Sequence, residues 1–143
     1  DTAALKAVLK TANGSVFNFI GLHPRPPVPG NDTIARDEQI KDAALMANSS
    51  ARPTVCMGDF NDAAWSWTSR RFKKYGGFRE PRIGRGLLSS FHAQYKFMRV
   101  PIDQLFVTES INLISFDRLE EFGSDHFPIS AKMFFDKPED TER

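Results

Sequence analysis

Cysteine is nearly absent from this chain, and the single Cys56 excludes an intramolecular disulfide and a cysteine-rich zinc site. Cys56 stands in the apolar run TVCMG, so we expect a small, buried core residue rather than a reactive thiol. Histidine is also scarce. The three present lack HExxH or similar spacing, which makes a zinc hydrolase a poor interpretation.

Long hydrophobic runs are missing as well. No stretch approaches the roughly 18 apolar residues of a membrane-spanning helix, and no signal peptide is visible. The formal net charge of +1 indicates no partner of one sign. With 143 residues, 41% of them hydrophobic and 26% charged, the chain fits one soluble domain with a single core.

Turn signals divide the chain into elements. Asn13-Gly14 predicts a hairpin with a type I′ turn, so the segment before it is expected as a strand although its Ala, Leu and Lys favour helix. Four prolines in HPRPPVPGN predict a loop. Gly58 is expected to end a short buried strand. Strands are expected on both sides of Asn13-Gly14 within residues 2–22 and at 54–57, 101–108, 111–120 and 127–135, and helices at 31–50 and 66–77.

The helix expected within 31–50 is capped by Asp32 or Thr33. Its expected buried face is Ile34, Ile40, Ala43, Ala44 and Ala47. Residues 76–101 should be irregular, and 136–143 should be a frayed tail. Strands with two helices and hairpin-like neighbours suggest an α+β fold, or a β-sandwich with helices outside.

Polar side chains gather at the ends of the predicted strands, where layered β folds place their sites. They are His23 after FIGL, Asp59 and Asn61 after VCMG, Asp103 within VPIDQLFV, and Asp125 and His126 in GSDHFPIS. Each cluster also has an ordinary interpretation, because Asp and Asn after glycine are common turn residues. Asp103 is harder to explain in that way, because a buried carboxylate needs a partner.

Four motifs together resemble the endonuclease/exonuclease/phosphatase family of metal-dependent phosphoesterases: LHP at 22–24, GDFN at 58–61, PIDQLF at 101–106 and SDHFPI at 124–129. The resemblance implies a DNase I-like four-layer fold, an α+β β-sandwich with flanking helices. Residues 1–143 would form its C-terminal half. HPRPP and GDFNDAAWS look most like a bacterial branch, many of whose members carry membrane-spanning helices before the catalytic domain. The full-length protein would then be membrane-tethered.

The resemblance implies a nuclease or phosphatase that hydrolyses a phosphodiester or phosphomonoester with Mg²⁺ or Mn²⁺. Asp59 would position and deprotonate the attacking water, and Asn61 would hold a metal-bound water or a phosphate oxygen. His126 would contact the scissile phosphate, with Asp103 orienting its ring. The residue chemistry agrees, because hard cations prefer carboxylate and amide oxygens, and an imidazole needs its second nitrogen engaged.

Two further residues complete the implied set: Asp125 in or beside the metal shell, and His23 as a second phosphate contact. The family's metal-binding Glu has no match here, since Asp1 fits no motif and Glu38 falls on the solvent face of a helix. We therefore expect the C-terminal part of a larger enzyme, with weak metal binding and little activity alone. Surface exposed by the missing half predicts self-association, such as a two-fold dimer.

Basic residues crowd the region from Arg70 to Arg99, which begins within the second predicted helix. They predict a phosphate-binding rim, for nucleic acid or anionic lipid headgroups, at Arg70, Arg71, Arg85 and Arg99. A solvated basic surface is an equal alternative. Trp65 and Trp67 are expected to pack rather than stack on a substrate. A non-catalytic phosphate-binding or interaction module is the alternative from another class, although the intact Asp, Asn and His set argues against it.

Overall fold

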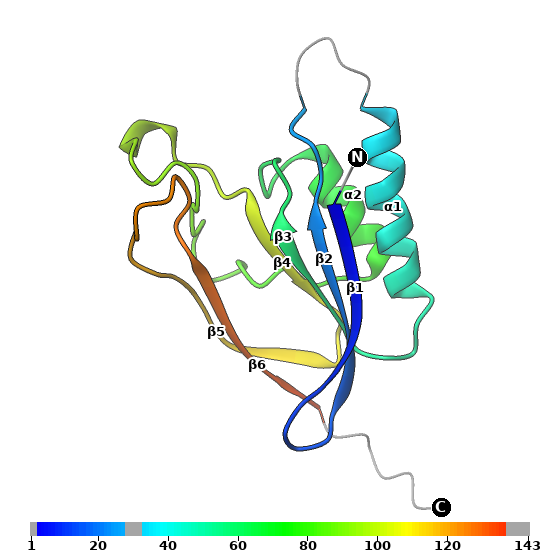
Figure 1. Ribbon diagram of the computed structural model, residues 1–143. Helices are drawn as coiled ribbons and strands as arrows, with labels where there is room; N and C mark the ends of the chain where they lie inside the picture. Colours follow the sequence, from blue (N-terminus) through cyan, green and yellow to red (C-terminus); the bar gives the residue numbers. More distant parts are fainter. Residues whose placement is uncertain (1–2, 28–32, 137–143) are drawn as a thin grey trace, which may run out of the picture.

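A computed structural model describes residues 3–27 and 33–136 of the chain (Figure 1). Its elements are β1 (Ala3–Lys10), β2 (Val16–His23), α1 (Ile34–Asn48), β3 (Thr54–Asp59), α2 (Trp67–Gly76), the 3-10 turn η1 (Lys96–Met98), β4 (Asp103–Val107), β5 (Ile111–Arg118) and β6 (Ile129–Phe135). Every predicted strand and helix is present. The candidate cap Asp32 and all of the predicted tail except Asp136 lie outside the described residues.

The strands form two packed layers, and the helices form a third (Figure 1). The main sheet has the order β1-β2-β3-β4, with β2 and β3 parallel and the other neighbours antiparallel. Helices α1 and α2 cover one face, and the antiparallel β5-β6 ladder lies against the other. This arrangement confirms the α+β fold with packed sheets and flanking helices. No helix in the described ranges has the length and apolar character needed to cross a membrane.

The hairpin predicted at Asn13-Gly14 is confirmed, but its turn is not type I′. Gly14 has a φ of 93°, whereas Asn13 does not take the positive φ that type I′ also requires. The amide of Gly14 donates to the Thr11 carbonyl (3.0 Å), and the amide of Thr11 donates to Ser15 (2.9 Å). The loop is therefore longer than two residues, with glycine at the one position of positive φ.

The main sheet and the two helices enclose an aromatic core. Phe72 lies 5.1 Å from Phe106 between ring centroids, and Phe60 packs edge-on against both. The buried members of this core are Ile20, Leu22, Ile40, Ala44, Ala47, Cys56, Phe60, Phe72, Phe78 and Phe106. Cys56 is buried as expected, and burial raises the pKa of its thiol.

The expected apolar face of α1 holds at four positions and is wrong at Ile34, which is exposed. Arg36 takes the buried position in the first turn instead. Its guanidinium can be buried because it pairs with Asp62 at 3.2 Å. Thr33 occupies the N-cap position, but its side chain makes no capping hydrogen bond.

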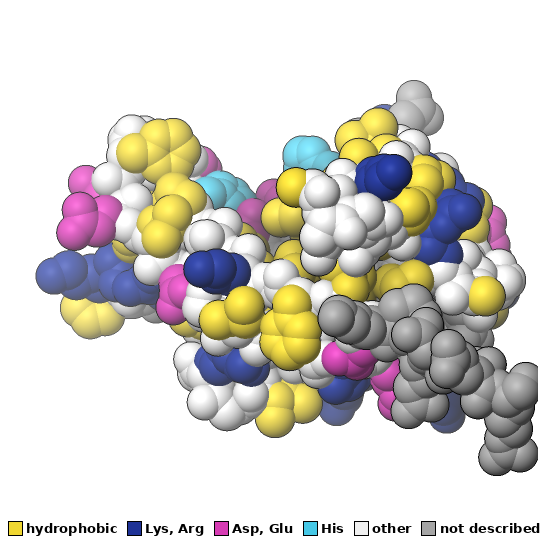
Figure 2. Space-filling model, turned by 90° about the horizontal axis from the view of Figure 1, so that it is seen from below, with side chains coloured by type: hydrophobic (Ala, Val, Ile, Leu, Met, Phe, Trp, Pro, Cys, Tyr) yellow, Lys and Arg dark blue, Asp and Glu magenta, His cyan; other side chains and the backbone are white. Residues whose placement is uncertain are grey.

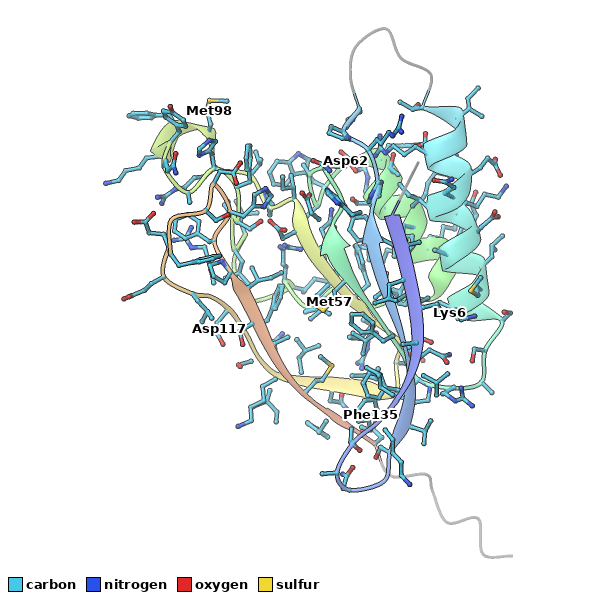
Figure 3. All side chains as sticks on the ribbon, in the orientation of Figure 1. Lys6, Met57, Asp62, Met98, Asp117 and Phe135 are labelled. Atoms are coloured by element: carbon cyan, nitrogen blue, oxygen red, sulfur yellow. The ribbon has the colours of Figure 1, made fainter. Side chains whose placement is uncertain are left out.

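A second core lies between the main sheet and the β5-β6 ladder. Its buried members are Val55, Leu105, Val107, Ile111 and Phe116. Half-buried apolar side chains surround them, and Figure 3 shows two of these, Met57 and Phe135, pointing into the space between the sheets.

Gly58 does not end its strand as predicted, because β3 continues to Asp59. Gly58 has a φ of 153°, and a Cβ at this position would lie 1.9 Å from the carbonyl oxygen of Leu22 on β2. Glycine thus allows the β3 backbone to pass close to Leu22 while Gly58 and Asp59 continue the pairing with β4. The consequence is that Asp59 belongs to the sheet rather than to a loose turn.

Candidate active site

Three strand ends meet at one edge of the main sheet (Figure 1). Strands β2 and β3 are parallel, so their last residues, His23 and Asp59, reach the same edge. Strand β4 runs antiparallel to β3, so its first residue, Asp103, pairs directly with Asp59. The segment before β6 joins them through the bridge between Phe91 and His126. All four motifs therefore converge.

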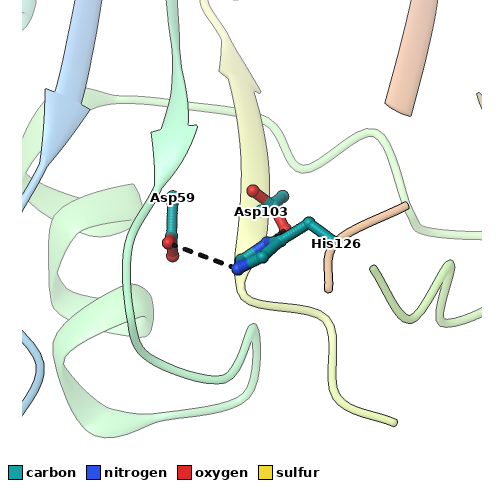
Figure 4. A group of neighbouring side chains, drawn as sticks. All are labelled: Asp59, Asp103 and His126. Atoms are coloured by element: carbon teal, nitrogen blue, oxygen red, sulfur yellow. Dashed lines mark hydrogen bonds and ion pairs between the residues drawn. The ribbon is translucent and has the colours of Figure 1, made fainter. Parts of the chain in front are cut away.

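Asp59, Asp103 and His126 form the centre of the site (Figure 4). The Nδ1 of His126 lies 2.7 Å from Oδ2 of Asp103, within hydrogen-bond distance. The other ring nitrogen, Nε2, lies 3.8 Å from Oδ2 of Asp59. Asp103 thus engages one nitrogen of the ring, which leaves Nε2 free to face the space beside Asp59.

A second histidine lies on the other side of Asp59. The Nε2 of His23 is 3.7 Å from Oδ2 of Asp59, and the His23 side chain is largely exposed. Figure 2 shows histidine side chains on both walls of a notch in the molecule, with acidic side chains between them. An anionic group entering this notch would meet imidazole from two sides.

Asn61 follows Asp59 in a tight turn with a φ of 50°. Its amide donates to Oδ1 of Asp59 (2.8 Å), and its Nδ2 donates to the carbonyl of Pro24 (2.9 Å). This is the ordinary turn chemistry expected after glycine, and it also leaves Oδ1 of Asn61 as an acceptor for a ligand. The turn interpretation of GDFN is therefore confirmed, and the site interpretation is compatible with it and stays a prediction.

The surroundings of Asp59 and His126 shift the pKa of each residue upward. Burial raises the pKa of Asp59, and the nearby Asp103 adds to that rise, although the Asn61 amide and both histidines oppose it. Burial alone would lower the pKa of His126, but the hydrogen bond and charge of Asp103, with the charges of Asp59 and Asp125, raise it overall. Asp59 is therefore disposed to accept a proton, and His126 is disposed to carry one.

Sequence reasoning missed the residues that support the Asp59 turn. Gln104 is fully buried, and its Nε2 donates to the carbonyl of Asp62 (2.8 Å) and to Oγ of Ser69 (2.9 Å). The carboxylate of Asp62 pairs with the buried Arg36. The sequence did carry a signal for Gln104, because it is a polar residue between Asp103 and the apolar run Leu105, Phe106 and Val107 in one strand.

Ser90 and Phe91 were also missed. The buried Ser90 Oγ accepts from the amide of Asp103 (3.1 Å). The Phe91 ring lies 5.0 Å from the ring of His126 between centroids. Both residues belong to the stretch expected to be irregular, where periodicity carries no information about burial.

The structure leaves two predicted groups outside the central cluster. Asp125 is exposed, and Oδ1 of its carboxylate accepts from Ser124 Oγ (3.4 Å). Arg71 lies over the Trp67 ring (4.1 Å) and contacts Tyr75. Among the other proposed rim residues, Arg70 is exposed, while Arg85 and Arg99 donate to backbone carbonyls. Their phosphate-binding role stays a prediction.

The expectation that Trp65 and Trp67 pack in the interior is wrong, because both are more than half exposed. Arg71 covers part of the Trp67 ring instead. The buried positions around the start of α2 are filled by Ala64 and Ser69.

The central cluster can accommodate a divalent cation. One ligand atom from each of Asp59, Asp103 and His126 lies within 4.8 Å of the others. Two carboxylates so close together repel each other when ionised, and a cation between them relieves that repulsion. Oxygen donors suit hard ions such as Mg²⁺ and Mn²⁺.

Comparison with known proteins gives one family. A family model for the endonuclease/exonuclease/phosphatase family matches residues 2–126. An endonuclease/exonuclease/phosphatase family protein from Bacteroides thetaiotaomicron has a similar structure, with a TM-score of 0.75 and 19% identity over 94% of this chain and 55% of that one. No curated protein matches the sequence.

Two further structures are similar. The mannosyl-6-phosphatase of Bacteroides thetaiotaomicron VPI-5482 gives a TM-score of 0.70 and 18% identity, over 92% of this chain and 57% of that one. The catalytic domain of human Nocturnin gives 0.72 and 15%, over 94% and 53%.

At such identities these likenesses establish the fold, and the chain spans about half the length of each structure. The family model, in contrast, covers most of the chain and all four motif regions up to His126. This chain therefore belongs to the endonuclease/exonuclease/phosphatase family, whose members generally hydrolyse phosphate esters.

Proposed function

We propose that this chain supplies the Asp–His part of a metal-dependent phosphoesterase that acts on phosphodiesters or phosphomonoesters. The 2.7 Å contact between Asp103 and His126, with Asp59 3.8 Å from the other ring nitrogen, carries this proposal. A structural salt bridge alone would not explain why this pair lies at an open sheet edge beside Asp59, whose carboxylate also faces His23.

In the proposed mechanism, Oδ2 of Asp59 orients a water molecule and takes its proton as the water oxygen attacks phosphorus. Protonated His126 donates from Nε2 to a non-bridging phosphate oxygen, where negative charge develops. Asp103 fixes the ring orientation by accepting from Nδ1. Exposed His23 approaches the phosphate from the opposite wall. The ester P–O bond breaks, and the leaving oxygen is protonated from solvent.

Mg²⁺ or Mn²⁺ would neutralise charge on the phosphate when it is bound at this edge. The oxygen donors at hand are the carboxylates of Asp59 and Asp103 and the Oδ1 of Asn61. Asp125, which is exposed and lies outside this cluster, is proposed as a further ligand, together with a Glu from outside these 143 residues. On this basis the chain alone binds metal weakly and has little activity, and robust turnover by the chain alone would contradict that part.

The test is the Mg²⁺-dependent hydrolysis of a bis-aryl phosphate by the longer protein. Asp59→Asn and His126→Ala should each lower kcat by several orders of magnitude, on the scale of removing a general base or an electrostatic stabiliser. Asp42→Asn, which removes an exposed carboxylate from α1, is the matched control and should leave the rate unchanged. Near wild-type rates for the first two variants would refute these residue roles, whereas no hydrolysis by the wild-type longer protein would support a non-catalytic phosphate-binding module instead.

A further inference from the structure

A short loop projects from the edge of the molecule that carries the site. It contains η1, and Figures 1 and 3 show it standing clear of both sheets, with Met98 at its tip. Phe97 is 103% exposed, Met98 63% and Tyr95 59%. Large apolar side chains scattered singly on a surface are ordinary, but three within four residues at a tip form a local apolar surface without cover. We call residues 95–98 the apolar tip.

The apolar tip is held in a fixed position relative to the site. Rings link it to the catalytic histidine: Tyr95 to His92 at 4.5 Å, His92 to Phe91 at 4.8 Å and Phe91 to His126 at 5.0 Å between centroids. The backbone is tied as well, because the amide of His92 donates to Met98 (3.2 Å). Whatever the tip contacts is therefore held beside His126.

The charges around the tip distinguish between two large phosphate-bearing partners, a nucleic acid and a lipid bilayer. Lys96 and Arg99 flank the apolar side chains, and residues 89–100 contain no acidic residue. The neighbouring stretch, joined to the tip by a hydrogen bond from Ala93 to Asp125 (2.7 Å), has the opposite sign. Its exposed acidic residues are Asp117, Glu120, Glu121 and Asp125.

This distribution favours a bilayer over a nucleic acid. A nucleic acid lying along the edge would need a continuous basic surface, and the acidic stretch interrupts it. A bilayer would meet the projecting tip first. There Phe97 and Met98 could enter the acyl boundary, Tyr95 could sit at headgroup level, and Lys96 could extend its amine to the lipid phosphates.

We propose that the apolar tip inserts into the interface of a phospholipid bilayer and places the His126 edge against the headgroups, so that the phosphoester substrate is a phospholipid. The substrate part rests on the proposed function, whereas the membrane contact does not. Three side chains form a weak and reversible anchor, comparable in kind to other single interfacial signals. The tip would thus orient the site at a membrane rather than hold the protein there permanently.

Flotation of the full chain with phosphatidylcholine vesicles tests the contact. Phe97→Ser and Met98→Ser should each weaken partitioning, with Phe97→Ser lowering it by about tenfold because a whole aromatic ring leaves the bilayer. Ile83→Ser is the matched control, since Ile83 is 74% exposed but lies in a different loop. The tip side chains are solvent-exposed, so thermal unfolding of all three variants should match the wild type.

Three results would overturn the membrane contact. The first is vesicle partitioning that Phe97→Ser leaves unchanged, and the second is an equal loss of partitioning with Ile83→Ser. The third is a Phe97→Ser variant that loses binding to an oligonucleotide but still binds vesicles. Asp59→Asn should bind vesicles normally. The substrate is then tested in the longer protein with vesicle phospholipid and a soluble bis-aryl phosphate. Hydrolysis of the soluble ester alone would refute the phospholipid assignment, whereas hydrolysis of neither would refute the proposed function itself.

Discussion

The two faces of the main sheet are closed to different degrees. Among the described residues, the helix side packs ten buried residues with two half-buried ones, whereas the ladder side has five buried and nine half-buried. The helix side is a finished core. On the ladder side, most apolar side chains between the two sheets are only half-buried. The edge strand β1 adds exposed Leu5 and Leu9 to this face.

The site joins these two unequal halves. Asp59 is followed by Phe60, which is buried in the helix-side core, so its turn is fixed by the closed half. His126 comes from the segment before β6, next to the open half, and is held mainly by Asp103 and Phe91. Stability and catalysis should therefore respond differently to changes on the two faces.

The largest contrast is expected between two phenylalanine truncations. Phe106→Ala on the closed side removes a fully buried ring and should lower the free energy of unfolding by about 3–5 kcal/mol. Phe135→Ala on the open side removes a half-buried ring and should lower it by about half as much. Urea titrations of both variants measure the difference, and equal losses would remove the distinction between the faces.

A smaller effect is expected at the pair that ties the Asp59 turn to α1. Asp62→Ala should destabilise the chain by about 2–3 kcal/mol, because it removes the nearer carboxylate partner of the buried Arg36 guanidinium (3.2 Å) and leaves only Asp37, 3.9 Å from Nε. The exposed pair of Lys41 and Glu38 is the control, and Glu38→Ala should change stability by less than about 0.5 kcal/mol. Thermal unfolding measures both variants, and an equal loss of stability in Asp62→Ala and Glu38→Ala would show that burial of the ion pair does not matter here.

The open face should also associate with a second copy. We expect a concentration-dependent dimer at micromolar concentration, because edge strands and uncovered apolar faces pair readily. Leu5→Lys should weaken it by about tenfold, whereas Leu45→Lys, on an exposed position of α1, should not. A monomeric wild-type mass by light scattering would show that the open face stays uncovered.

The smallest effect is a pH dependence of stability at the site. Because the pKa of His126 is raised in the folded state, the stabilisation from its protonated form is complete below the ordinary value of 6.5 and is lost as pH rises through the raised pKa. NMR titration of the imidazole should show this rise, and Asp103→Asn should lower the pKa by removing its main charged partner. An unchanged titration in that variant would contradict the assigned role of Asp103.

Much of the fold and of the candidate site could be predicted from the sequence, because the signals are local. The GDFN and SDHFPI motifs, the strand and helix order, and the burial of Cys56 all follow from short patterns of apolar, turn and capping residues. The same patterns misplaced Ile34, Trp65 and Trp67, because a local pattern does not show which neighbour covers a side chain.

By itself, the sequence determined which residues could carry the chemistry and which edge of the sheet they would share. Only the tertiary structure decided that Asp59 faces Asp103 across β3 and β4, that Gln104 and Arg36 support the turn, and that Phe97 projects uncovered beside the site. The physical reason is that strand register and burial depend on contacts between distant segments. Those contacts form only when the two faces of the sheet are packed.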